Sequence, residues 1–142
     1  LRTRWNFPLA GGVISELVTD RQSLYFGGAD GFLYCLNADT GKLNWKYEVK
    51  QALISRPTIA GGRLFAVGAD DTIFAFDAGS GSLIWTYKRR TPQTTVIHAV
   101  STPLVDGNEV LAGMSDGFLV AVSVEEGVLK WERKLQITSK FT

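Results

Sequence analysis

The chain is poor in the two residue types that most often build metal and redox sites, since its 142 residues include one cysteine and one histidine. Cys35 alone cannot form a disulfide within the chain, and the paired cysteines of a zinc site are absent. His98 alone cannot supply a histidine metal cluster. We therefore expect this chain to bind neither a metal nor a cofactor.

An excess of charge of one sign and long apolar runs are also missing. Fifteen Lys and Arg residues against fourteen Asp and Glu residues give a formal net charge of +1, so no basic surface for nucleic acid stands out. No apolar run approaches the roughly 18 residues that a membrane span needs. Gly79 and Gly81 lack the third glycine of a dinucleotide fingerprint, and no phosphate-binding Gly-Lys-Ser/Thr loop is found. We expect no nucleic-acid partner, no direct membrane span and no enzymatic activity.

The chain does have a repeat. The stretch 37–45 recurs as 77–85 and, more loosely, as 123–131. Each copy starts with Asn, Asp or Ser, places Gly four residues later and ends an apolar run in Trp, which predicts a turn followed by a strand. All four tryptophans fall on this repeat, at steps of 40, 40 and 46 residues: Trp5, Trp45, Trp85 and Trp131. A period of about 40 residues built from short strands is typical of a β-propeller, in which each repeat is one blade.

Four strands fit into each repeat. In the first repeat we predict strands over 13–18, 23–27, 32–36 and 43–49. Residues 4–9, around Trp5, read as a lone outer strand. The predicted fold is therefore all-β, a β-propeller segment of about three four-stranded antiparallel blades plus one stray strand. Its parts are a partial blade over 1–10, blades over about 11–50, 51–90 and 91–136, and a tail over 137–142.

The third strand of each repeat, over 32–36, 72–76 and 118–122, is almost continuously apolar, so both of its faces must be covered, in this fold by adjacent blades. Cys35, Ala75 and Ala121 share one repeat position, which indicates that a small residue is needed there for packing. Cys35 is accordingly predicted to be a buried core residue and not a nucleophile.

The order Ala, then Gly three residues on and Trp four residues after it, resembles the tryptophan-docking repeat of the quinoprotein-type, PQQ-like β-propellers. The repeat density and the lack of enzyme signatures are most similar to the BamB-like branch of that family. The resemblance covers nearly the whole chain, although Val124 stands where Ala is expected. It implies a parent ring of seven or eight blades. It also implies that blades dock through Trp5, Trp45, Trp85 and Trp131 with Gly41, Gly81 and Gly127.

The BamB-like resemblance implies a non-catalytic scaffold for protein–protein interaction that aids the assembly of outer-membrane β-barrel proteins. Its partners would be proteins of the outer-membrane assembly machinery, and its location the periplasm, as an outer-membrane lipoprotein. Two alternatives remain open: a piece of a PQQ-dependent quinoprotein dehydrogenase, and a sensor propeller attached to another module such as a kinase. The dehydrogenases of this family gather quinone and calcium ligands from many blades, and a chain of about three blades could not assemble that site by itself.

Aspartate recurs in the turn between the second and third strands, at Asp30, Asp70 and Asp116. Asp-Gly in such a turn predicts a tight hairpin in which both central residues have φ > 0. A calcium site is the alternative, but no second carboxylate follows at the spacing of a calcium loop, so we favour turn chemistry.

Six additional residues between Trp85 and Ser101 break the repeat. In a four-stranded meander, the link from the fourth strand leaves on the same side as the turn between the second and third strands. Insertions in repeat proteins often map to a binding face, although a tolerated surface loop with no role explains this one equally well. The predicted interaction face comprises Asp30, Asp70, Asp116, Arg89, Arg90 and His98.

Ser15, Ser55 and Ser101 also recur in step with the tryptophans. No histidine accompanies them in step, so we predict a structural or channel-lining role.

Three blades and a stray strand cannot close a ring of 4 to 8 blades. Because the chain begins with Leu1, we expect a processed or excised piece, and we expect it to self-associate or to belong to a longer chain.

Overall fold

The computed structural model describes residues 4–13, 15–53, 55–89 and 101–135. These residues form three sheets of four strands each, which we call blades A, B and C. Blade A consists of β1 (Val18–Thr19), β2 (Ser23–Gly27), β3 (Phe32–Asn37) and β4 (Leu43–Glu48). Blade B consists of β5 (Thr58–Ala60), β6 (Arg63–Val67), β7 (Thr72–Asp77) and β8 (Leu83–Lys88). Blade C consists of β9 (Leu104–Asp106), β10 (Glu109–Gly113), β11 (Phe118–Ser123) and β12 (Leu129–Lys134).

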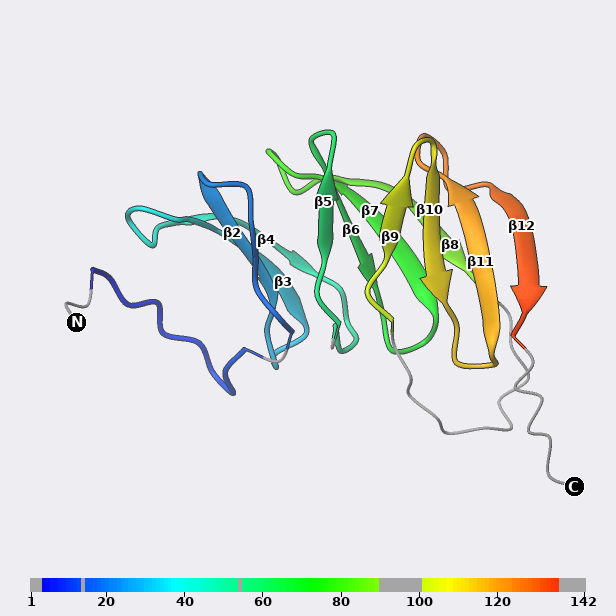
Figure 1. Ribbon diagram of the computed structural model, residues 1–142. Coiled ribbons are helices and arrows are strands. Elements are labelled where there is room, and N and C mark those ends of the chain that lie inside the picture. The colour runs from blue at the N-terminus through cyan, green and yellow to red at the C-terminus, as the bar shows by residue number, and fades with distance from the viewer. Residues whose placement is uncertain (1–3, 14, 54, 90–100, 136–142) are drawn as a thin grey trace, which may run out of the picture.

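The strands of each blade follow one another as an antiparallel meander, and the blades stand side by side in chain order (Figure 1). The turns between second and third strands, over 28–31, 68–71 and 114–117, lie at one end of the blades, which we call the hairpin face. The turns between first and second strands and between third and fourth strands lie at the other end, which we call the opposite face. The predicted all-β architecture of about three four-stranded blades is confirmed.

The core consists of two apolar interfaces, because each blade packs against the next. In the central blade, Ile73 and Ala75 pack toward blade C, whereas Phe74 and Phe76 pack toward blade A. All four are buried, which confirms that the third strand is covered on both faces. Cys35, Ala75 and Ala121 lie directly opposite the tryptophans of their own blades, where a larger side chain would meet the indole ring.

The predicted stray strand over residues 4–9 is wrong. The structure assigns no strand there, because no strand of the described chain lies beside this segment to complete a ladder. Its apolar side chains still cover the outer side of blade A, where Trp5, Phe7 and Leu9 pack on a cluster that includes Phe26 and Tyr34.

The predicted first strand over 13–18 is also wrong over most of its length, since β1 contains only Val18 and Thr19 and a single bridge joins Val13 to Gly28. A serine side chain replaces the missing ladder, because Ser15 Oγ accepts a hydrogen bond from the backbone N–H of Gly27 at 2.6 Å. Ser101 Oγ accepts one from the N–H of Gly113 at 2.7 Å. These two serines therefore hold the innermost segment of a blade against its second strand.

The tight turns at the hairpin face differ from the predicted type. Only the last turn residue has positive φ, at +86° for Gly31, +66° for Asp71 and +86° for Gly117. The N–H of Gly28 donates to Phe32 O at 2.9 Å and the N–H of Gly31 donates to Gly28 O at 3.2 Å. This is a three-residue hairpin loop, in which a turn is followed by one left-handed residue, and it does not require φ > 0 at the preceding aspartate.

Candidate functional site

The indole rings of Trp45 and Trp85 each lie over a turn of the following blade. A Cβ atom added to Gly81 or Gly127 would come closer than 3.0 Å to the ring, which real Cβ atoms essentially never do. Both glycines have positive φ, at +76° and +69°, so neither the conformation nor the space suits another residue. The two rings are buried, at 9% and 8% exposure.

The indole N–H completes each of these contacts. Trp45 Nε1 donates to Ala78 O at 2.9 Å, and Trp85 Nε1 donates to Val124 O at 2.8 Å. A buried indole N–H without an acceptor would be costly, so this bond fixes the position of each ring on the next blade. Ala38, Ala78 and Val124 occupy one repeat position, and since the bond uses the backbone carbonyl, the departure at Val124 does not affect it.

Trp5 docks in the same way, although its segment is not a strand. Trp5 Nε1 donates to Ala38 O at 3.0 Å, and a Cβ on Gly41 would meet the Trp5 ring. Trp131 has no such turn to cover within the described residues. Its Nε1 donates at 3.3 Å to Glu109 Oε2 of its own blade, and its ring is half-buried.

Polar side chains shape the turns on which the rings rest. Asn37 Oδ1 accepts hydrogen bonds from the N–H groups of Asp39 and Thr40, both at 2.9 Å. Asp77 Oδ1 does the same for Gly79 and Ser80, and the bond from the Ser80 N–H is the main cause that lowers the pKa of Asp77. The first residue of the repeat therefore presets the turn that places the glycine under the incoming ring.

Asp30, Asp70 and Asp116 lie at the hairpin face, one in each blade. In each, Oδ1 accepts a hydrogen bond from the N–H two residues on, at 3.1 to 3.2 Å: Phe32, Thr72 and Phe118 respectively. Their side chains therefore act in their own turns. Asp30 and Asp70 remain exposed, and Asp70 pairs with Lys88 at 3.5 Å.

Arg89 contacts Asp116, and the contact is a structural one within the blades. Its Nε donates to Asp116 Oδ2 at 2.8 Å, its Nη1 pairs with Glu132, and its guanidinium lies 4.1 Å from the centre of the Phe118 ring. Burial would lower the pKa of Arg89, but Asp116 and Glu132 raise it above its usual value. Only 13% of the side chain is exposed, so Arg89 ties the base of the insertion to blade C. Arg90 and His98 lie outside the described residues.

Asp71 is a contact that the sequence analysis missed. It replaces the glycine of the other two turns, is buried, and accepts hydrogen bonds from the N–H of Ser115 at 3.0 Å and from the Ser115 hydroxyl. Asp71 thus joins the hairpin turns of blades B and C. The signal for it was the departure from Asp-Gly to Asp-Asp at a position that needs positive φ.

The described residues do not form a recognisable catalytic or metal-binding site. Within them, no three His, Cys, Asp or Glu side chains cluster in a way that could hold a metal ion. Cys35 is buried at 1% exposure, and this burial raises the pKa of its thiol. The described part of the chain also contains no helix of the length and apolarity that crossing a membrane requires. What the geometry offers is a surface of hydrogen-bonded turns with charged side chains at one end.

Solved structures with the same fold include an assembly factor and redox enzymes. BamB from Moraxella catarrhalis is 26% identical with a TM-score of 0.84, over 94% of this chain and 41% of that one. The quinohemoprotein alcohol dehydrogenase ADHIIG from Pseudomonas putida HK5 is 20% identical with a TM-score of 0.71, over 89% of this chain and 21% of that one. A europium-containing methanol dehydrogenase is 21% identical with a TM-score of 0.76, over 92% of this chain and 26% of that one.

The chain thus spans 41% of the length of the BamB structure it matches. A comparison with curated proteins finds no significant match. The family model described as outer membrane protein assembly factor BamB matches residues 2–140. The chain therefore belongs to the family of the outer membrane protein assembly factor BamB, within the PQQ-like β-propellers.

Proposed function

We propose that the chain is part of a non-catalytic propeller scaffold that binds proteins in the periplasm and aids the assembly of outer-membrane β-barrel proteins. The observation that carries this proposal is the match of residues 2–140 to the family of an outer membrane protein assembly factor. Its partner would be a component of the outer-membrane assembly machinery.

The hairpin face is the surface we propose for this partner. Arg89, the last described residue before the insertion, is held on blade C at this face by Asp116. Asp30 and Asp70 are exposed on the same face, on turns that their own side chains stabilise. A preorganised surface of this kind loses little conformational entropy when it binds another protein.

Site-specific crosslinking tests this surface. A photoreactive amino acid replaces Asp30 or, separately, Asp70 in cells that produce the protein, and the captured species are identified by mass spectrometry. We expect both positions to capture a component of the outer-membrane assembly machinery. Thr86, exposed on the outer strand β8, is the matched control and should capture none. Equal capture from Thr86, or no capture of such a component from either aspartate, would contradict the proposal.

The absence of catalysis has a separate test. Calorimetric titration of the chain with PQQ in the presence of calcium is expected to give no saturable heat, because the described residues place no cluster of carboxylates that could hold the ion. A stoichiometric heat with a submicromolar dissociation constant would overturn this part of the proposal.

A further inference from the structure

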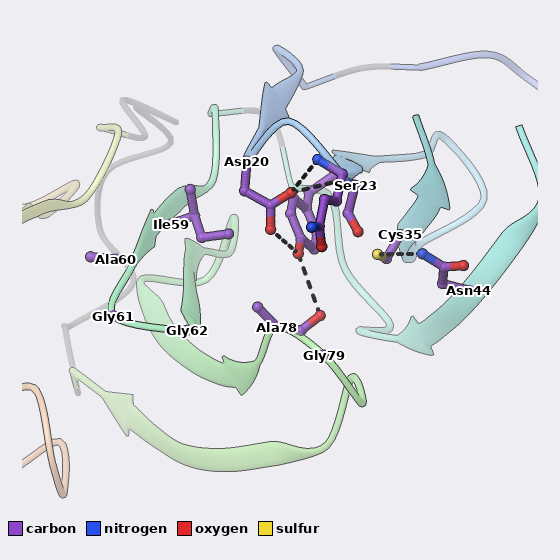
Figure 2. Close-up of a pocket in the computed structure, with 12 residues that line it drawn as sticks. Asp20, Ser23, Cys35, Asn44, Ile59, Ala60, Gly61, Gly62, Ala78 and Gly79 are labelled. Atoms are coloured by element: carbon purple, nitrogen blue, oxygen red, sulfur yellow. Dashed lines mark hydrogen bonds between the residues drawn. The ribbon is translucent and has the colours of Figure 1, made fainter. Parts of the chain in front are cut away.

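A polar cleft opens on the opposite face between blades A and B. It encloses a cavity of about 470 Å³. Asp20 and Ser23 line it from blade A, and Ala78 and Gly79 line it from blade B (Figure 2). The Tyr25 hydroxyl lies between the two sides, 3.1 Å from Asp20 Oδ2 and 3.5 Å from Ala78 O.

The equivalent cleft between blades B and C is filled by Arg63. Ser23 and Arg63 occupy the same place, since each begins the second strand of its blade and pairs with the last residue of the third. Arg63 Nη1 donates to Val124 O at 2.7 Å and to Glu125 O at 3.2 Å. Arg63 Nη2 pairs with Glu125 Oε2 at 3.3 Å. A cleft between two blades of this chain therefore accommodates a guanidinium group.

The acceptor that Arg63 uses is also present in the first cleft. Val124 O receives the Trp85 indole and the Arg63 guanidinium together, whereas Ala78 O receives the Trp45 indole and only a long contact from Tyr25. Tyr25 has a single phenolic proton, so it can serve Asp20 or Ala78 O but not both. One acceptor in this cleft is therefore left without a donor from Tyr25.

Each of the two clefts contains one carboxylate that could pair with a cation. Gly79 replaces Glu125, so the second cleft's acid is missing from the first, but Asp20 supplies a carboxylate where blade B has Ala60. Burial alone would raise the pKa of Asp20, yet the backbone N–H groups of Ser23 and Gln22 hold it below its usual value. Among the described residues, no Lys or Arg lies within salt-bridge distance of this carboxylate. The first cleft thus has a carboxylate and a carbonyl that accepts the Trp45 indole but no guanidinium, whereas Val124 O accepts both an indole and a guanidinium.

We propose that the cleft between blades A and B binds the guanidinium of an arginine side chain presented by another protein, with the Asp20 carboxylate and the Ala78 carbonyl as acceptors. Arginine suits the site better than lysine because its planar fork reaches two separated acceptors at once. The cleft lies at the opposite end of the blades from the hairpin face. A test of this site therefore has an outcome that is independent of the test of the proposed function.

Nuclear magnetic resonance of the isotope-labelled chain tests the site with an acetylated Gly-Gly-Arg-Gly-Gly peptide as the probe. We expect saturable shifts of the Ser23 and Gly79 amides with a dissociation constant on the order of millimolar, as for one exposed ion pair with additional hydrogen bonds. The corresponding lysine peptide should bind about fivefold more weakly. Absence of saturable shifts up to about 50 mM peptide would overturn the proposal.

Three variants sharpen the test. Asp20→Asn keeps the acceptor that shapes the turn but removes the charge, and should weaken binding about tenfold. Asp39→Asn removes an exposed carboxylate on the same face outside the cleft and should leave binding unchanged. Ser23→Arg supplies from within the group that Arg63 supplies in the next cleft, and should abolish peptide binding. Unchanged affinity in Asp20→Asn would contradict the assignment even if Ser23→Arg failed to fold.

Discussion

Trp85 and Trp131 occupy the same position of successive blades, each opposite a small residue of its own third strand, yet their surroundings differ. Trp85 is buried over Gly127 and donates to the carbonyl of Val124 on the next blade. Trp131 is half-buried and bonds only within blade C. The difference teaches that the repeat tryptophan joins a pair of blades, and that a four-stranded blade forms even where its tryptophan has no following blade of the described chain to dock on.

The row of residues beside each tryptophan repeats the contrast. In blade B, Phe65 and Ala75 lie in one cross-strand row with Trp85 and are fully buried by blade C. In blade C the same row contains Leu111 and, at its end, Leu104, which is 61% exposed. Blade C therefore presents the apolar side of a blade interface with no blade of the described chain against it.

The largest expected effect separates the two tryptophans. Trp85→Ala should lower the free energy of unfolding by about 3 to 5 kcal/mol, because it empties a buried site and removes the indole hydrogen bond to Val124 O, which then keeps only the Arg63 guanidinium as a donor. Trp131→Ala should cost less than about 1 kcal/mol in the same chain, since its ring makes no interblade contact among the described residues. Urea denaturation of both variants measures the difference. Wild-type melting of Trp85→Ala would rule out the docking role.

Two glycine substitutions should distinguish the steric cost of a side chain under the indole ring from the cost of the positive φ angle. Gly127→Ala is expected to cost about 3 kcal/mol, because the new methyl group meets Trp85 and the residue also needs positive φ. Gly117→Ala needs a similar φ of +86° but has nothing within 4 Å of the new methyl group, so about 1 kcal/mol is expected. Equal losses of thermal stability in the two variants would show that ring contact contributes nothing.

A smaller effect concerns association through blade C. We expect copies of the chain to self-associate at micromolar concentration, because the exposed row around Leu104, Leu111 and Trp131 is apolar. Light scattering after size exclusion should report a mass above that of the monomer, and Trp131→Ala should weaken the association about tenfold. A monodisperse monomer would contradict this expectation. Weakening by Trp5→Ala as well would indicate that the two ends of the segment meet.

The sequence allowed the regular part of the fold to be predicted, because the repeat specifies it locally. The second strand of blade A was predicted at its observed bounds, and the third and fourth to within one residue, since turn residues flank each apolar run. The stray strand and the long first strand were wrong. Those segments do not form a continuous ladder, and side-chain bonds such as that of Ser15 Oγ supplement isolated backbone bonds, which apolar patterning does not reveal.

The candidate sites were harder to predict because they depend on contacts between repeats. Arg89 was placed at the correct end of the blades, but its burial against Asp116 and Phe118 follows from packing of blade C. The cleft between blades A and B was missed because it exists only where the short side chain of Ser23 leaves space that the long side chain of Arg63 occupies in the next cleft. Only the register of two blades shows that Ser23 and Arg63 stand in the same place.

The single thiol, Cys35, allows the separation of blades A and B to be measured by chemical labelling. Cys35 packs in the cluster between blades A and B, opposite Trp45, and only 1% of it is exposed although it lines the cleft, so a thiol reagent should react with it slowly in the closed state. Burial also raises the pKa of the thiol, so the reactive thiolate is scarce until the interface opens. The rate of labelling at Cys35 therefore measures how often blade A parts from blade B, and the labelling chemistry needs no introduced cysteine.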